Sequence, residues 1–127
     1  MRLLLDTHAL IWSATSPSRI PRQTLDILRD AEHVFVSPVS AYEMTFKHMA
    51  GKLPIARRLL ADLKAYLERQ GYATLPISLH HAEVAGQLPL DHRDPFDRLL
   101  AAQALTDDLA LVSNDALLDR FGVRRLW

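Results

Sequence analysis

The sequence predicts an α/β fold in which a mostly parallel sheet is covered by helices on both faces. Short apolar runs alternate along the chain with segments whose apolar residues recur every three or four positions, the patterns of buried strands and amphipathic helices. Strands that alternate with helices form parallel sheets, because each helix carries the chain back across the sheet. The length of 127 residues fits one domain, so we expect a single domain over residues 1–127.

The first part of the chain is expected to form a strand, two helices and a second strand. In order, these are residues 2–5, 8–14, 20–31 and 34–36. The first is a short apolar run that ends at Asp6. Pro17 separates the two helices, and the second helix has a leucine or alanine at every third position on one face. The last segment is β-branched and aromatic, which is typical of a strand.

Two further helices are expected next. Ser40 and Glu43 have the spacing of a capping box, in which each side chain bonds a free backbone N–H group of a new helix. This helix is expected to end near Gly51, because glycine is a natural C-terminal stop. Apolar residues at three- and four-residue intervals predict one amphipathic helix over residues 55–69, closed by Gly71.

The second half of the chain is expected to supply the remaining strands. The expected elements are a strand at 74–78, a helix at 80–86, a helix at 95–105, a strand at 109–112, a short helix after 115 and a strand at 123–127. Pro76 lacks a backbone N–H group and marks the first of these strands as short or at a sheet edge. Asp94 and Pro95 open the longer helix, since Asp is a favoured N-cap and Pro a favoured first helical residue.

Charge and composition exclude several classes of protein. Lysine plus arginine equals aspartate plus glutamate at 15 each, so no global basic field drives nonspecific binding to nucleic acid. Cysteine is absent, which excludes thiolate zinc sites, disulfides and thiol catalysis and fits a reducing compartment. We therefore expect a cytoplasmic location. No segment is long and apolar enough to span a bilayer, so no membrane partner is expected.

Four acidic residues lie far apart in the sequence, yet each stands at or near an expected helix start. They are Asp6, Glu43, Asp97 and Asp115. In an open parallel sheet, the strand ends that precede such helices point to one edge, so these carboxylates can converge in a single crevice. Converged carboxylates repel one another, and a hard divalent cation such as Mg²⁺ or Mn²⁺ keeps them ionised. The sequence therefore predicts a metal site for one or two ions.

Each acid also has a purely structural explanation, because a carboxylate near a helix N-terminus caps free N–H groups and complements the helix dipole. Asp94, followed by proline, is read as a cap, which leaves Asp97 to point at the crevice. The carboxylate of Asp6 is expected to be free for metal binding, since the neighbouring Thr7 is available to cap the helix.

Capping competes with metal binding at the other two acids. Glu43 can bond back to the backbone near Ser40, and Asp115 can serve as a cap or as a turn residue beside Asn114. Capping gives no reason, however, for so many helix starts at one sheet edge to be acidic. Oxygen ligands without cysteine favour Mg²⁺ or Mn²⁺ over zinc.

An acidic site of this kind matches phosphodiester hydrolysis, because the metal lowers the pKa of a bound water and stabilises negative charge on the attacking and leaving oxygens. Such a reaction needs no protein nucleophile. Arg98 or Arg93 can hold a phosphate oxygen, with a solvent-exposed or Asp-paired arginine as the structural alternative for either. Four polar residues are candidates for orienting the carboxylates or water: Thr7, Ser40, Ser113 and Asn114.

Histidine and lysine residues receive no catalytic role from the sequence. Surface or capping roles are expected for His80, His81 and His92, while His8 lies close to Asp6 and is the one histidine worth testing. The basic cluster that contains Lys47 is read as a solvated helix face.

Four segments together resemble the PIN-domain ribonucleases in order and spacing: residues 3–8, 40–43, 92–103 and 113–115. They span essentially the whole chain, and the seven residues from His92 to Arg98 are the most specific part. The likeness is greatest to VapC-type toxins of bacterial toxin–antitoxin pairs. The acidic residues of the family fall on Asp6, Glu43, Asp97 and Asp115, with Asp94 an additional acid of this subgroup. Ser113 stands where relatives often have threonine, and it keeps the hydroxyl group.

The resemblance implies a three-layer α/β/α sandwich, Mg²⁺- or Mn²⁺-dependent cleavage of RNA, a homodimer, and inhibition by a small cognate antitoxin. The alternative is a non-catalytic RNA- or antitoxin-binding module that retains the acidic metal pocket. Rossmann and P-loop enzymes share the alternation of elements, but the four glycines of this chain form no phosphate-binding loop. A receiver domain also has an acidic Mg²⁺ pocket, but its acids would be gathered early in the chain.

Overall fold

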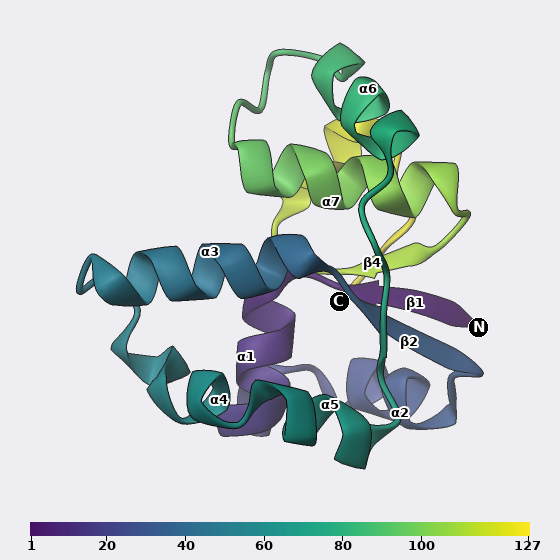
Figure 1. Ribbon diagram of the computed structural model, residues 1–127. Coiled ribbons are helices and arrows are strands. Elements are labelled where there is room, and N and C mark those ends of the chain that lie inside the picture. Colours follow the sequence, from purple (N-terminus) through teal and green to yellow (C-terminus); the bar gives the residue numbers. More distant parts are fainter.

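A computed structural model of the protein describes residues 1–127 and shows a five-stranded sheet flanked by helices (Figure 1). The strands are β1 (Arg2–Leu5), β2 (His33–Val36), β3 (Ala73–Thr74), β4 (Ala110–Val112) and β5 (Arg125–Leu126). Their order in the sheet is β3-β2-β1-β4-β5, and every neighbouring pair is parallel. The predicted α/β fold with a parallel central sheet is therefore confirmed.

Helices cover both faces of this sheet. The α-helices are α1 (Thr7–Thr15), α2 (Arg22–Asp30), α3 (Pro38–Met49), α4 (Arg57–Ala61), α5 (Leu63–Gln70), α6 (Leu79–Gln87) and α7 (Pro95–Thr106), and short 3₁₀ turns are η1 (Pro17–Arg19), η2 (Pro54–Ala56) and η3 (Ala116–Phe121). Figure 1 shows α6 and α7 on one side of the sheet and α1, α2, α4 and α5 on the other, which gives three layers. No helix has the length and apolar character needed to cross a lipid bilayer.

The first strand shows why the sheet is buried on both faces. Leu3, Leu4 and Leu5 are all fully buried. Leu3 and Leu5 belong to the core shared with α1, α2 and α4, whereas Leu4 packs in the opposite core with Leu100 of α7 and Leu111 of β4. Because successive side chains of a strand point to opposite faces, a strand covered on both sides must be apolar throughout.

The order in which strands are added to the sheet reverses at β1, so β2 and β4 lie on opposite sides of it. The chain runs from β1 outward through β2 to β3, and then returns to the other side of β1 to form β4 and β5. The carboxyl ends of β1 and β4 are therefore neighbours at a topological switch point, where open α/β sheets bind ligands. Asp6 follows β1 directly and its amide donates to the carbonyl of Val112 at 3.0 Å, while Ser113 follows β4.

Helix α3 starts three residues earlier than expected. Ser37 is its N-cap, with an Oγ atom that accepts from the amide of Val39 at 3.0 Å, and Pro38 is its first residue. The capping box expected between Ser40 and Glu43 is therefore wrong. The reason is that proline fixes a helical φ and has no N–H group to leave unsatisfied, so Pro38 begins the helix. Both Ser40 and Glu43 are buried within it.

The single helix expected over residues 55–69 is broken in two. Asp62 leaves the helical region with φ −141°, and this separates α4 from α5. The apolar periodicity survives the break, because Leu59 of α4 and Tyr66 of α5 pack against the same core. Gly71, with φ +71°, ends α5 as predicted, and β3 is a two-residue edge strand. Of the strand expected at 74–78, only Thr74 belongs to β3, so the expected bounds are wrong, whereas the short edge position that Pro76 predicts is confirmed.

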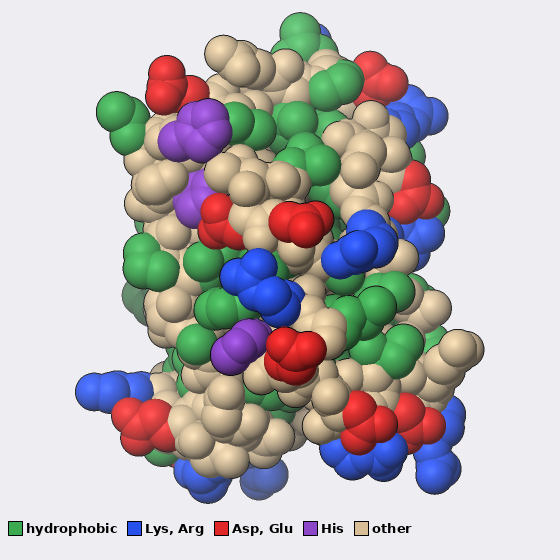
Figure 2. Space-filling model, turned by 90° about the vertical axis from the view of Figure 1, so that its right-hand side faces the viewer, with side chains coloured by type: hydrophobic (Ala, Val, Ile, Leu, Met, Phe, Trp, Pro, Cys, Tyr) green, Lys and Arg blue, Asp and Glu red, His purple; other side chains and the backbone are tan.

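The surface at the amino ends of the strands carries charges of both signs. Figure 2 views the molecule from this side and shows acidic and basic side chains interspersed among apolar ones, without a large area of a single charge. This mixture agrees with the equal numbers of acidic and basic residues in the sequence. Local concentration of charge is instead found at the carboxyl ends of the strands.

Candidate active site

A polar cleft of about 410 Å³ lies at the carboxyl ends of the strands, and no hydrophobic residue lines it. Its lining residues are Asp6, Thr7, His8, Glu43, Lys47, Asp94, Asp97, Asn114 and Asp115. The four acids singled out from the sequence come from four separate parts of the chain, and the fold brings them into this one cleft. The convergence expected from the sheet topology is therefore observed.

Asp6 is both an N-cap and a lining residue of the cleft. Its Oδ1 atom accepts from the amide of Ala9 at 2.7 Å, which makes Asp6 the cap of α1. The expectation that Thr7 would cap this helix is therefore wrong, because Thr7 is already the first helical residue. Only 7% of Asp6 is exposed, and Ser113 from the end of β4 also hydrogen-bonds its side chain.

Glu43 is held by two neighbours rather than by the helix backbone. The Thr7 hydroxyl donates to Glu43 Oε1 at 2.6 Å and lies 3.0 Å from the hydroxyl of Ser40. The ammonium group of Lys47, one turn further along α3, forms an ion pair with Glu43 Oε2. These contacts fix the orientation of the Glu43 carboxylate, with Thr7 in direct contact and Ser40 in contact with Thr7.

Asp97 and Asp115 lie at more exposed positions of the cleft, with side chains 23% and 37% exposed. Asp94 caps α7 by accepting from the amides of Phe96 and Asp97 at 2.9 and 3.1 Å, so its expected capping role is confirmed. Asp115 is the N-cap of η3, and its own amide donates to Ser113 Oγ at 3.0 Å. Asp115 therefore combines the capping and cleft-lining roles that the sequence left open.

His92 lies against two of these acids, which the sequence did not predict. Its Nε2 atom is 2.9 Å from Asp97 Oδ2 and 3.6 Å from Asp115 Oδ2. The side chain is only 13% exposed, and its ring stacks on Phe121. The expectation of a surface or capping role for His92 is therefore wrong, because the loop that carries it folds back over the start of α7.

Two residues of the site were therefore not predicted from the sequence. A sequence pattern could have predicted one of them but not the other. Lys47 lies four residues after Glu43 on one helix, a spacing at which oppositely charged side chains meet, so its pairing was available from the sequence. His92 lies in an irregular segment before α7, where no periodicity predicts the direction of a side chain. His81 does take the expected capping role, because its Nδ1 accepts from the amide of Ser78 at 2.9 Å.

Burial and mutual repulsion raise the pKa of two of the acids. The pKa of Asp6 rises to about 6, chiefly because of burial and further because of the charges on Glu43 and Asp115. Hydrogen bonds from Ser113 and the Ala9 amide oppose this rise. The pKa of Asp97 also rises to about 6, through burial and the charge of Asp94, with His92 acting in the opposite direction.

Lys47 is the one lysine that lines the cleft. Partial burial acts to lower the pKa of Lys47, but the hydrogen bond and charge of Glu43 outweigh it, and the charges of Asp94 and Asp97 add to them. The net effect is a raised pKa, so Lys47 stays protonated. One ammonium group does not neutralise the five carboxylates that line the cleft, which leaves an excess of negative charge that a cation can balance.

Arg98 does not reach the cleft, so the expectation that it holds a phosphate is wrong. It is only 9% exposed, and its guanidinium group points into the protein. It donates to five backbone carbonyls at 2.7 to 3.4 Å, those of Ala85, Gly86, Leu88, Pro89 and His92. The expected alternatives, a solvent-exposed or Asp-paired arginine, are also wrong, because the turn after α6 presents its carbonyls to this side chain.

The donor set of the cleft suits a hard divalent cation. Carboxylate oxygens are the ligands that Mg²⁺ and Mn²⁺ prefer, and the cleft offers them from Asp6, Glu43, Asp97 and Asp115. One possible ligand atom each from His92, Asp97 and Asp115 lies within 4.8 Å of the others. The Thr7 hydroxyl donates to Glu43 and so helps to hold one of these carboxylates in place.

Comparisons with known proteins identify relatives of this sequence and fold. The family model of the PIN domain matches residues 3–123. One solved structure is VapBC2 from Rickettsia felis bound to a DNA fragment from its promoter. It has a TM-score of 0.73 and 18% identity, and the match covers 100% of this chain and 99% of that chain. DNA-bound VapBC from Salmonella typhimurium has a TM-score of 0.74 and 20% identity, and the match covers 99% of this chain and 97% of that chain. FitAcB from Neisseria gonorrhoeae has a TM-score of 0.69 and 18% identity, and the match covers 98% of this chain and 96% of that chain. No curated protein matches the sequence. At these identities the structural likeness shows a shared fold.

Proposed function

Because this chain belongs to the PIN-domain family, whose model spans residues 3–123, we propose that it is a metal-dependent endoribonuclease and the VapC-type toxin of a toxin–antitoxin pair. PIN domains are generally nucleases. The observation that carries the proposal is the meeting of Asp6, Glu43, Asp97 and Asp115 in one polar cleft. Capping explains Asp6 and Asp115, but it explains neither Glu43 nor Asp97, and it does not require the four to line one cleft.

The proposed cofactor is Mg²⁺ or Mn²⁺, as one or two ions. When bound, such an ion lowers the pKa of a water molecule and stabilises negative charge on the oxygens of a phosphodiester. Asp6, Asp97 and Asp115 would hold it directly, with Glu43 as the fourth carboxylate. A cation also suits the raised pKa of Asp6 and Asp97, because it would stabilise the ionised form of two carboxyl groups that lie beside other negative charges.

The other residues of the cleft act through position and charge. The Thr7 hydroxyl orients Glu43 by donating to it, and Ser40 supports Thr7 from within α3. Lys47 faces the cleft from the same helix and can attract the phosphate backbone of RNA as well as balance Glu43. Asn114 is exposed at the rim, where its amide can donate to a phosphate oxygen.

The proposed partners follow from the family and from the solved relatives. VapBC and FitAB are named as assemblies in the matching structures, and this supports a small cognate antitoxin as the partner of this chain. We further propose a homodimer of single-domain subunits. We also propose a cytoplasmic location, because RNA is the proposed substrate.

Cleavage of RNA tests the proposal against its alternative, a binding module that keeps the acidic pocket without catalysis. The purified protein, incubated with total RNA, is expected to cleave it with Mg²⁺ or Mn²⁺ and not with EDTA. Asp6→Asn and Asp97→Asn should each reduce the rate by at least about a hundredfold, because each removes a charge on which cation binding depends. Sequencing the RNA ends that appear with the wild type and not with Asp6→Asn would locate the cleavage site.

A matched control tests whether the loss of cleavage comes from the cleft itself or from removing any one negative charge. Asp30 is exposed at the end of α2, far from the cleft, so Asp30→Asn should cleave like the wild type. RNA binding without cleavage by the wild type, under all metal conditions, would favour the binding module. Undiminished cleavage by Asp6→Asn would refute the assignment of the cleft.

A further inference from the structure

We propose that His92 is a nitrogen ligand of the metal site and that it raises the preference of the site for Mn²⁺ over Mg²⁺. This inference rests on the proposed function, since it requires that the cleft bind a divalent cation. His92 would add a nitrogen ligand to the four carboxylates of the cleft.

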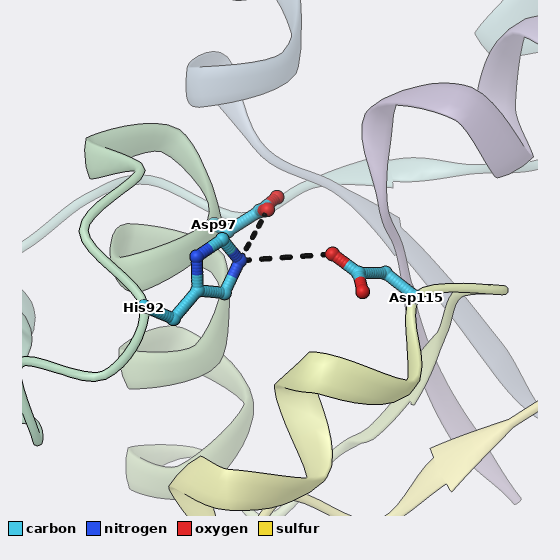
Figure 3. Close-up of side chains that lie close together, drawn as sticks. All are labelled: His92, Asp97 and Asp115. Atoms are coloured by element: carbon cyan, nitrogen blue, oxygen red, sulfur yellow. Dashed lines mark hydrogen bonds and ion pairs between the residues drawn. The ribbon is translucent and has the colours of Figure 1, made fainter.

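Distances within the cleft support a shared ligand set. Figure 3 shows the His92 ring pointing at Asp97 and Asp115, with Nε2 at 2.9 Å from Asp97 Oδ2 and 3.6 Å from Asp115 Oδ2. Two atoms that bind one ion at about 2.1 Å lie about 3 Å apart when adjacent and about 4 Å apart when opposite. The three side chains therefore need only small shifts to meet at one cation.

The His92 ring is held in place rather than free to turn. It stacks on Phe121, with ring centres 5.7 Å apart and an interplanar angle of 0°. The backbone carbonyl of His92 accepts from the Arg98 guanidinium at 3.0 Å, which fixes the loop beneath the ring. A ligand whose orientation is already set loses less conformational entropy on binding an ion.

An imidazole ligand changes which ion is preferred. Mg²⁺ favours oxygen ligands and retains its waters, whereas an imidazole nitrogen is a better ligand for transition metals. His92 should therefore add more to the affinity for Mn²⁺ than to that for Mg²⁺. The competing explanation is that His92 only forms structural hydrogen bonds with Asp97 and Asp115, and a structural role would affect both ions equally.

His8 provides a matched control because it is a histidine that lines the cleft. Its ring lies against Trp12, with centres 5.5 Å apart, and it makes no hydrogen bond or ion pair with an acid of the cleft. His8→Gln and His92→Gln therefore each remove an imidazole at or beside the cleft, but only the second removes the proposed ligand.

The test measures metal binding without RNA. The full-length protein is titrated with Mn²⁺ and monitored by electron paramagnetic resonance, with Mg²⁺ as competitor, and the bound Mn²⁺ is examined for nuclear coupling with ¹⁴N- or ¹⁵N-labelled histidine. The wild type and His8→Gln should show coupling to histidine nitrogen, and His92→Gln should lose it. The affinity of His92→Gln for Mn²⁺ should fall roughly tenfold or more, and its affinity for Mg²⁺ should fall less.

Several results would overturn the inference. Bound Mn²⁺ without histidine coupling in the wild type refutes it, and this measurement does not depend on whether His92→Gln folds. Equal losses of Mn²⁺ and Mg²⁺ affinity show a structural role, and tighter Mn²⁺ binding by His92→Gln shows that the ring competes with the ion. A wild type that binds no Mn²⁺ refutes the metal site itself, whereas coupled Mn²⁺ without RNA cleavage refutes only the proposed activity.

Discussion

The carboxyl group of Asp6 serves two purposes that conflict when no cation is bound. It caps α1 through Ala9, and it also lies buried beside the charges of Glu43 and Asp115. Its pKa is raised from 3.8 to about 6, so the folded protein holds the Asp6 proton more tightly than the unfolded chain. Below about pH 4 both states are protonated and Asp6 has no net effect. Between about pH 4 and pH 6 the unfolded chain ionises first, and folding stability is lost.

Replacing Asp6 should therefore stabilise the ion-free protein at high pH. A shift of this size corresponds to up to about 3 kcal/mol, and we expect Asp6→Asn to raise the free energy of unfolding by about 1–3 kcal/mol at pH 8 in EDTA. The asparagine oxygen can still accept from the Ala9 amide. Urea unfolding at pH 8 and pH 4 measures the difference, which should disappear at pH 4. An equal effect at both values would show that charge is not the cause.

The segment between α6 and α7 is ordered by one side chain of α7. The Arg98 guanidinium binds three carbonyls of this segment and two of the last turn of α6, and it lies 5.9 Å from the ring centre of Phe121. Because His92 belongs to the same segment, the position of its ring depends on this arginine. A planar group with five donors suits such a cluster of carbonyls, and lysine has neither the shape nor the number of donors.

Arg98→Lys should therefore be costly although it keeps the charge. We expect it to lower the free energy of unfolding by about 2–4 kcal/mol, because buried carbonyls lose their donors. Arg93→Lys is the matched control, since Arg93 is exposed in the same segment and should change stability by less than about 0.5 kcal/mol. Urea unfolding gives both values, and hydrogen exchange over residues 86–92 locates the change. Similar small effects for the two variants would contradict the assigned role of Arg98.

A cation in the cleft would join parts of the fold that the chain itself leaves far apart. Asp6 follows β1, Glu43 lies on α3, Asp97 on α7 and Asp115 before η3. These elements belong to both helical layers and to the centre of the sheet. Binding of an ion to the folded state alone therefore stabilises the whole molecule against unfolding.

Mn²⁺ is accordingly expected to raise global stability. At a free concentration a hundredfold above its dissociation constant, it should add about 2.7 kcal/mol to the free energy of unfolding. The urea midpoint should rise while the slope of the transition stays the same. Asp97→Asn should lose most of this gain, and the exposed Asp30→Asn should keep it. A gain of the same size in Asp97→Asn would place the stabilising ion elsewhere.

The sequence by itself determined the local features of this protein. Apolar runs identified the strands, because a strand covered on both faces must be apolar throughout. Pro95 and Gly71 marked helix ends, because each residue constrains or permits particular backbone angles. Four acidic residues at or near expected helix starts predicted a cation site at one sheet edge, because parallel strands all end on the same side. Each of these inferences needs only near neighbours or the general geometry of a sheet.

Only the tertiary structure decided which side chains meet. Thr7 bonds Glu43 from 36 residues away, and His92 reaches Asp115 as well as Asp97. Arg98, next to Asp97 in sequence, points into the protein instead of into the cleft. These contacts depend on β2 and β4 lying on either side of β1 and on the path of an irregular loop. Local patterns constrain backbone conformation, whereas a contact between distant residues is fixed only when the whole sheet has assembled around them.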